Sequence, residues 1–161
     1  MRHYERGGSM VEFAFAATAL LLVVLGIIEF GRALYMYHTV DNAARIGARW
    51  AMVRGAASCS DANPVASCDA APSAIQTYVQ ANVPIVDSGT LKVATAWSSS
   101  PFPKSSCPAP PSPGPGSLSA GANAANHLVC VTVTYPFKFA VPFVSKATWN
   151  LSSTSEMTVT H

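Results

Sequence analysis

The dominant pattern in the chain is an uncharged apolar run, FAFAATALLLVVLGII, over residues 13–28. With the preceding SMVE it covers residues 9–28, and about 20 helical residues suffice to cross the hydrocarbon core of a bilayer. The pattern therefore predicts a transmembrane segment at about residues 10–30.

A helical pattern continues beyond this run. Apolar positions recur at intervals of three or four residues, which is typical of one helix face: Phe30, Leu34, Tyr37, Val40, Ala44, Ala48 and Met52. Asp41 and Arg45 are spaced to pair along a helix, and no proline interrupts the stretch. We therefore expect one continuous helix over residues 8–56, with about half of it outside the membrane. Three glycines in it are positions where another helix can approach closely or where the helix can flex: Gly26, Gly31 and Gly47.

The rest of the chain reads as a series of short elements. Residues 72–83, PSAIQTYVQANV, predict a short helix that begins at a proline and ends before another. Alternating apolar positions predict strands at residues 91–97, 127–137 and 150–161. Residues 98–126 are rich in proline, serine, glycine and alanine, so we expect an exposed, partly disordered loop there. The predicted fold class is α+β: a long N-terminal helix that carries a small antiparallel β-sheet domain with one short helix.

The segment PFKFAVPFVSKATW, residues 136–149, has two interpretations. It holds four aromatic side chains and two lysines. It is either an exposed apolar surface for partner subunits or the membrane, or a hairpin that completes the core. The second interpretation is the more ordinary one and is favoured here.

Composition narrows the class of protein. Half of the 161 residues are apolar and only 11% are charged, against about a quarter in a typical soluble domain. The net charge of +2 is too small to indicate a nucleic-acid-binding protein. A small exported domain fits this composition better than a soluble cytosolic enzyme.

The cysteines indicate an oxidising compartment. Cys59, Cys68, Cys107 and Cys130 all lie on the C-terminal side of the apolar run. An even number there predicts disulfides, although four free buried thiols remain the alternative. Of three possible pairings, the nearest-neighbour set, Cys59–Cys68 and Cys107–Cys130, is favoured because it closes short loops. No CxxC spacing occurs, so no metal site is expected. The cysteines also favour a cytoplasmic N-terminus and an exported C-terminal domain.

Glu12 distinguishes three interpretations of the N-terminal segment. A cleaved secretory signal would end in a small-residue cut site, but an amphipathic pattern follows instead. A plain membrane anchor has no use for a carboxylate in its span, where burial is costly. A chain cut between Gly7 and Gly8 would have a new ammonium group one helical turn from Glu12, and pairing would offset the desolvation of both. Glycines at the cut also leave the backbone unobstructed for a peptidase, though they equally suit a flexible lead-in to the helix.

Three stretches, GGSMVEFAF, GIIEFGRALY and DNAARIGARWA, together resemble the TadE-like proteins, small pseudopilin-like components of bacterial tight-adherence (Flp-type) pilus assembly systems. The resemblance covers about residues 7–53. It implies a leader over residues 1–7, cut by a prepilin peptidase between Gly7 and Gly8, with Glu12 and Phe13 opening the membrane run. A cut after Gly8 is chemically possible, but it would make Glu12 the fourth residue, which the family pattern disfavours. Phe13 stands where the major pilins of these systems usually have tyrosine. The other residues that carry the resemblance are Glu29, Phe30, Gly31, Arg32, Asn42, Arg45, Gly47 and Arg49.

The resemblance implies a structural protein of the bacterial inner membrane, with residues 57–161 forming a periplasmic domain built like that of pilin-like proteins. Its expected partners are other pilin-like subunits, inner-membrane pilus assembly proteins, the prepilin peptidase and membrane lipid. No nucleotide loop, nucleophile motif or zinc motif occurs, so neither an enzyme nor a cofactor, nucleic acid or small-molecule substrate is expected. The alternative function is an uncleaved membrane-anchored adaptor. A secreted protein that loses its N-terminal segment is the third, and the long amphipathic continuation argues against it.

Overall fold

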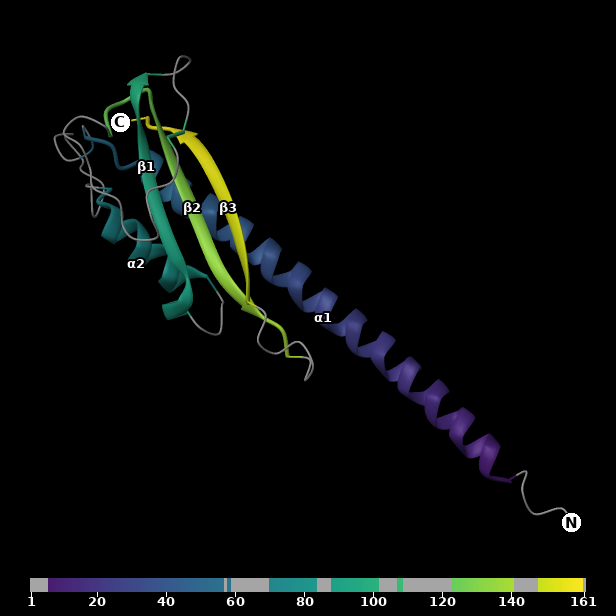
Figure 1. The fold of residues 1–161 in the computed structure, drawn as a ribbon. Coiled ribbons are helices and arrows are strands. Elements are labelled where there is room, and N and C mark those ends of the chain that lie inside the picture. Colours follow the sequence, from purple (N-terminus) through teal and green to yellow (C-terminus); the bar gives the residue numbers. More distant parts are fainter. Residues whose placement is uncertain are drawn as a thin grey trace, which may run out of the picture.

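A computed structural model describes residues 6–56, 58, 70–83, 88–101, 107–108, 123–140 and 148–160, with the backbone alone at residues 6, 7 and 88. A long helix projects far beyond a three-stranded sheet that packs on its C-terminal half (Figure 1). The elements in chain order are α1 (Arg6–Met52), α2 (Pro72–Asn82), a 3₁₀ turn (Ser88–Thr90), β1 (Lys92–Pro101), β2 (His127–Lys138) and β3 (Thr148–Thr158). This confirms the predicted α+β class.

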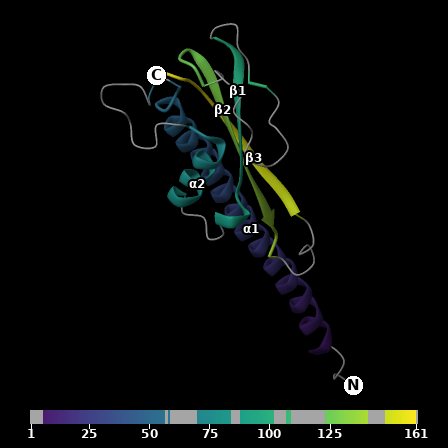
Figure 2. The same ribbon diagram turned by 90° about the vertical axis from the view of Figure 1, so that its left-hand side faces the viewer.

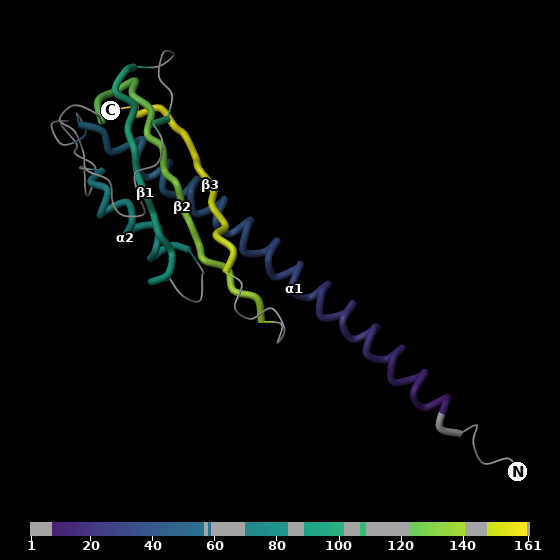
Figure 3. The backbone as a smooth tube through the Cα atoms, viewed as in Figure 1, coloured from purple at the N-terminus to yellow at the C-terminus, as the bar shows by residue number. Residues whose placement is uncertain are grey.

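The two halves of α1 have different environments. The most apolar window of the helix has no buried residue, and its end protrudes from the domain (Figure 3). Within this half, the Thr18 hydroxyl donates to the Ala14 carbonyl oxygen one turn back along the helix, at 2.8 Å. From Val40 onward the inner face is buried, with Val40, Ala44 and Ala48 fully covered. Phe30, Leu34 and Tyr37, expected on the same packed face, remain largely exposed.

The sheet is antiparallel, in the order β1-β2-β3. Thr95 lies opposite Val131, and Val133 lies opposite Ser153. Side chains alternate across the sheet, so one face of each strand points to the helices. α1 contacts β2 and β3, while α2 contacts α1 and β1 (Figure 2). The core between them is made mainly of small and β-branched residues, with Leu91 and two tryptophans: Val40, Ala43, Ala44, Ala48, Trp50, Ala51, Ala70, Ile75, Val79, Val83, Leu91, Val93, Trp97, Val129, Val131, Val133 and Val159.

The strand β3 runs beside α1 and in the same direction. Near its middle, the Ser153 hydroxyl donates to Asp41 Oδ1 at 2.9 Å. Beyond its end, the Thr160 N–H donates to the Met52 carbonyl oxygen at 3.0 Å. This bond satisfies one of the carbonyl groups that the last turn of a helix leaves without a partner.

Several predicted boundaries were wrong. The loop predicted at residues 98–126 cannot begin at residue 98, because β1 continues to Pro101 after an irregularity and pairs there with His127. Residues 102–106 and 109–122 of this predicted loop lie outside the described residues. Ser98 is buried, and its hydroxyl accepts the Leu128 N–H at 2.9 Å. Serine and proline have low strand propensity, but proline is tolerated on an edge strand such as β1. The other boundaries differ by a few residues: α1 covers Arg6–Met52 instead of 8–56, and β3 covers Thr148–Thr158 instead of 150–161.

Candidate functional site

The N-terminal part of the predicted site is exposed. Gly7 and Gly8 lie in the first turns of α1, which begins at Arg6. Apart from the backbone of its own helix turn, no described atom lies within 4 Å of the position that a Cβ on Gly8 would take. Glu12 is exposed, and the Phe13 side chain is 74% exposed. The predicted pairing of Glu12 with a free N-terminus stays a prediction.

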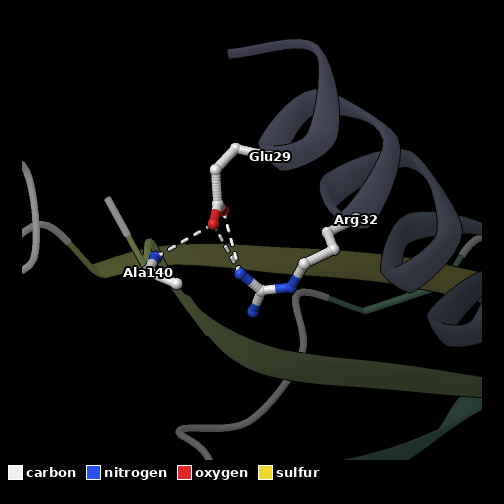
Figure 4. Close-up of polar contacts among 3 residues, drawn as sticks. All are labelled: Glu29, Arg32 and Ala140. Carbon is white, nitrogen blue, oxygen red and sulfur yellow. Dashed lines mark hydrogen bonds and ion pairs between the residues drawn. The ribbon is translucent and has the colours of Figure 1, made fainter. Parts of the chain in front are cut away.

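The second motif, Glu29-Phe30-Gly31-Arg32, joins the helix to the far end of the sheet. Arg32 Nη1 donates to both carboxylate oxygens of Glu29, at 2.8 and 2.9 Å. The Ala140 N–H, just beyond β2, donates to Glu29 Oε1 at 3.2 Å (Figure 4). The Arg32 guanidinium also lies 5.2 Å from the ring centroid of Phe137. The Glu29 side chain is only 12% exposed as a result.

This Glu29–Arg32–Ala140 contact serves two purposes. It gives a carboxylate at the end of the apolar run a charged and a neutral donor, so that its charge is compensated. It also fixes the loop end of the β2–β3 pair against α1 at the level where the helix leaves its apolar run. Phe30 and Gly31 point elsewhere: Phe30 is 66% exposed, and no atom lies within 4 Å of a Cβ built on Gly31.

The third motif lies in the packed half of α1. Arg45 Nη2 lies 2.9 Å from Asp41 Oδ2, which realises the predicted helical pair. A Cβ on Gly47 would lie 2.8 Å from Val79 Cγ2 and 3.0 Å from Val131 Cγ1. Gly47 is therefore a point where α1 lies close against both α2 and β2, with no room for a side chain. The neighbouring helix at this glycine belongs to the same chain.

The remaining residues of the resemblance have no such contacts. Asn42 and Arg49 are exposed. Gly26 has no atom within 4 Å of its Cβ position. These positions, like Phe13 and Gly31, are available to partners and carry no packing role within the described chain.

One predicted disulfide is present. Cys107 and Cys130 are bonded, with their Cα atoms 5.9 Å apart, and Cys130 is buried in β2. This bond belongs to the favoured nearest-neighbour pairing. Cys59 and Cys68 lie outside the described residues. Among the described residues, no group of three histidine, cysteine or acidic side chains is placed to hold a metal ion.

Sequence reasoning missed two aromatic features. Trp50 on α1 stacks on Tyr78 of α2 with ring centroids 5.3 Å apart, and the Arg54 guanidinium lies 4.2 Å from the Trp50 centroid. The aromatic segment at residues 136–149 also divides. Phe137 is buried, as the hairpin interpretation expects, whereas Trp149 is 61% exposed. Trp149 lines an apolar groove of about 340 Å³ between α1 and β3, formed by Phe30, Ala33, Leu34, Tyr37, Trp149, Asn150, Leu151 and Ser152.

Comparison with known proteins places the likeness in the first helix. No curated protein and no solved structure matches the chain significantly. The family match instead covers the exposed N-terminal turns of α1, the apolar run, the Glu29–Arg32 ion pair and Gly47. Residues 7–49 match the family model described as TadE-like protein, so the likeness of this chain to that family lies in α1 and agrees with the resemblance seen in its sequence.

Proposed function

We propose that the protein is a minor, pseudopilin-like structural subunit of a bacterial tight-adherence pilus assembly machine. The observation that carries this proposal is the TadE-like match over residues 7–49. The match includes the apolar N-terminal half of α1, whose most apolar window has no buried residue. A long apolar helix face without an internal partner is suited to lipid and to the helices of other subunits. The proposed role is assembly and does not include catalysis.

The protein would be anchored in the inner membrane by the first half of α1. This half is long and apolar enough to cross a bilayer. The Cys107–Cys130 disulfide supports an oxidising location for the domain, which is the periplasm in this proposal. The N-terminus would then face the cytoplasm.

Processing by a prepilin peptidase between Gly7 and Gly8 is the second part of the proposal. Cleavage there makes Glu12 the fifth residue of the mature chain, so that its carboxylate lies about one helical turn from the new ammonium group. The two charges then compensate each other within one chain or between neighbouring chains. Exposure of both Gly8 and Glu12 leaves this region accessible for such contacts.

The alternative is an uncleaved adaptor, in which the helix only tethers the domain. One observation favours it: α1 begins at Arg6, so Gly7 and Gly8 are helical, whereas a peptidase binds its substrate with an extended backbone. On this alternative, Glu12 is an acid at the membrane boundary and the mature chain begins at Met1.

The intact mass and N-terminal sequence of the membrane-purified protein, with and without the peptidase, decide between the two. We expect a chain that begins at Gly8 only when the peptidase is present. Gly7→Leu should block cleavage, because a branched side chain obstructs the bound backbone, while Gly26→Leu is the matched control and should be processed normally. A chain that begins at Met1 under both conditions would replace the pseudopilin assignment with the adaptor.

A further inference from the structure

The apolar groove defined above lies where α1 leaves its apolar run. Four of its lining residues come from α1 and four from the start of β3. Three of its large side chains are substantially exposed: Phe30 at 66%, Trp149 at 61% and Tyr37 at 48%. Such a cluster of exposed large apolar side chains is typical of a surface that contacts another protein or a membrane.

The position of the groove along α1 identifies that partner. If residues 9–28 cross the hydrocarbon core, a rise of 1.5 Å per residue places Phe30 about 3 Å, Leu34 about 9 Å and Tyr37 about 13 Å beyond Ile28. The polar layer on each side of a bilayer core is about 5–8 Å thick. Phe30 and Leu34 thus fall in or at the edge of this layer, and Tyr37 lies just outside it.

Trp149 lies at the same level, although it is distant in the sequence. It shares the groove with Phe30 and Leu34, and its strand partner Phe137 contacts Arg32. The end of the sheet that carries it points toward the N-terminal half of α1 (Figure 1). Tryptophan and tyrosine are enriched at this depth because their rings are apolar and their N–H and O–H groups reach water.

The charges near the groove are compatible with a phospholipid surface. Lys138, at the end of β2, is exposed. The acid at this level, Glu29, is compensated by Arg32 and the Ala140 N–H. Lysine and arginine near a membrane surface are attracted to anionic lipid head groups.

We propose that the apolar groove is a lipid-contact site that seats the domain on the outer leaflet, with Trp149 in the region between the phosphate and the upper acyl chain. The groove is the direct continuation of a helix face that is already apolar, so lipid that surrounds the helix extends into it. Contact through both α1 and β3 fixes the rotation of the whole molecule about the axis of α1, relative to the membrane. This inference rests on the proposed membrane anchor.

The test measures the depth of Trp149 in vesicles. The full chain carrying Trp50→Phe and Trp97→Phe retains Trp149 as its single tryptophan, and both replaced residues are buried. The protein is reconstituted at low density into vesicles of phosphatidylcholine and phosphatidylglycerol, with phosphatidylcholine brominated near the top or near the end of the acyl chain. We expect roughly two-fold stronger quenching by the shallow bromines, because the groove begins at Phe30, about 18 Å from the bilayer centre and so just outside the hydrocarbon core.

A difference measurement keeps the test valid if the double substitution weakens the fold. Trp149→Phe in the otherwise unchanged chain retains only the two buried tryptophans, so lipid quenching should be largely lost. Trp149 that is quenched by aqueous iodide and not by lipid would overturn the proposal. Shielding of Trp149 that appears only at high protein density would also overturn it, since a second copy would then occupy the groove.

Flotation of the same vesicles separates this proposal from the anchor on which it rests. Protein that does not float with the lipid contradicts the membrane anchor itself. Protein that floats with Trp149 still open to water contradicts the lipid-contact site and leaves the anchor intact.

Discussion

Substitution of Gly47 tests the packing of α1 directly. A Cβ at this position would lie 2.8 Å from Val79 Cγ2 and 3.0 Å from Val131 Cγ1, about 0.5–1 Å closer than an ordinary carbon–carbon contact. Both valines are fully buried, so the surrounding core has to move. Overpacking of this kind costs about 1–3 kcal/mol.

Helix propensity acts in the opposite direction, and a matched substitution removes it. Replacing glycine by alanine in a helix interior gains about 1 kcal/mol. Gly31→Ala receives the same gain without a clash, since no atom lies within 4 Å of its Cβ position. The difference in unfolding free energy between Gly47→Ala and Gly31→Ala should therefore be about 1–3 kcal/mol.

Thermal unfolding of the full chain in detergent, followed by circular dichroism, measures this difference. We expect the Tm of Gly47→Ala to lie roughly 3–10 °C below that of Gly31→Ala. Val79→Ala removes the closest methyl group, so it should cost less in the Gly47→Ala background than in the wild type, by about 0.5 kcal/mol or more. Equal Tm values for the two glycine variants, or an unchanged cost of Val79→Ala, would refute the close approach at Gly47.

Two further predictions concern the predicted site residues. Glu12→Ala should leave membrane insertion intact and reduce co-purification with pilus components, because Glu12 is exposed and has no packing role; unchanged co-purification would remove Glu12 from the mechanism. Cys130→Ala should lower the unfolding free energy by about 2–4 kcal/mol through loss of the Cys107 crosslink. Cys107→Ala should have a closely similar effect in urea unfolding, and a much smaller one would show that the loss at Cys130 comes from its buried side chain instead of the bond.

Local periodicity was sufficient for most elements of the fold. The alternation at residues 127–137 predicts β2 because one face of this strand contacts the helices and the other does not. The pattern at residues 72–83 predicts α2, whose Ile75 and Val79 are buried as the spacing requires. The extension of β1 to Pro101 was missed because serine and proline resemble a loop in composition. It depends on bonds to residues about 30 positions away, such as that between Ser98 and Leu128.

The site was predictable only as far as its contacts are local. The spacing of Glu29 and Arg32 suits an ion pair along one helix, but the second donor to Glu29 is the backbone of Ala140, which no sequence pattern identifies. The groove has the same limitation, because Trp149 meets Phe30 only after the sheet has folded onto the helix. Phe30 and Leu34 follow the helical pattern of Val40, yet the sheet does not cover them.

The pairing of α1 with β3 has a mechanical consequence. The helix is fastened to the β2–β3 pair at three levels: by the Glu29–Ala140 bond just beyond β2, by the Asp41–Ser153 bond near the middle of β3, and by the Met52–Thr160 bond just beyond β3. Between Glu29 and Met52 the helix rises about 35 Å, and the strand covers a comparable length at about 3.3 Å per residue. A pull on the exposed half of α1 along its axis would therefore load these fastenings and the β2–β3 hydrogen bonds together, in shear, instead of opening them one after another. The packed half of the helix and the sheet would then move as one stiff rod.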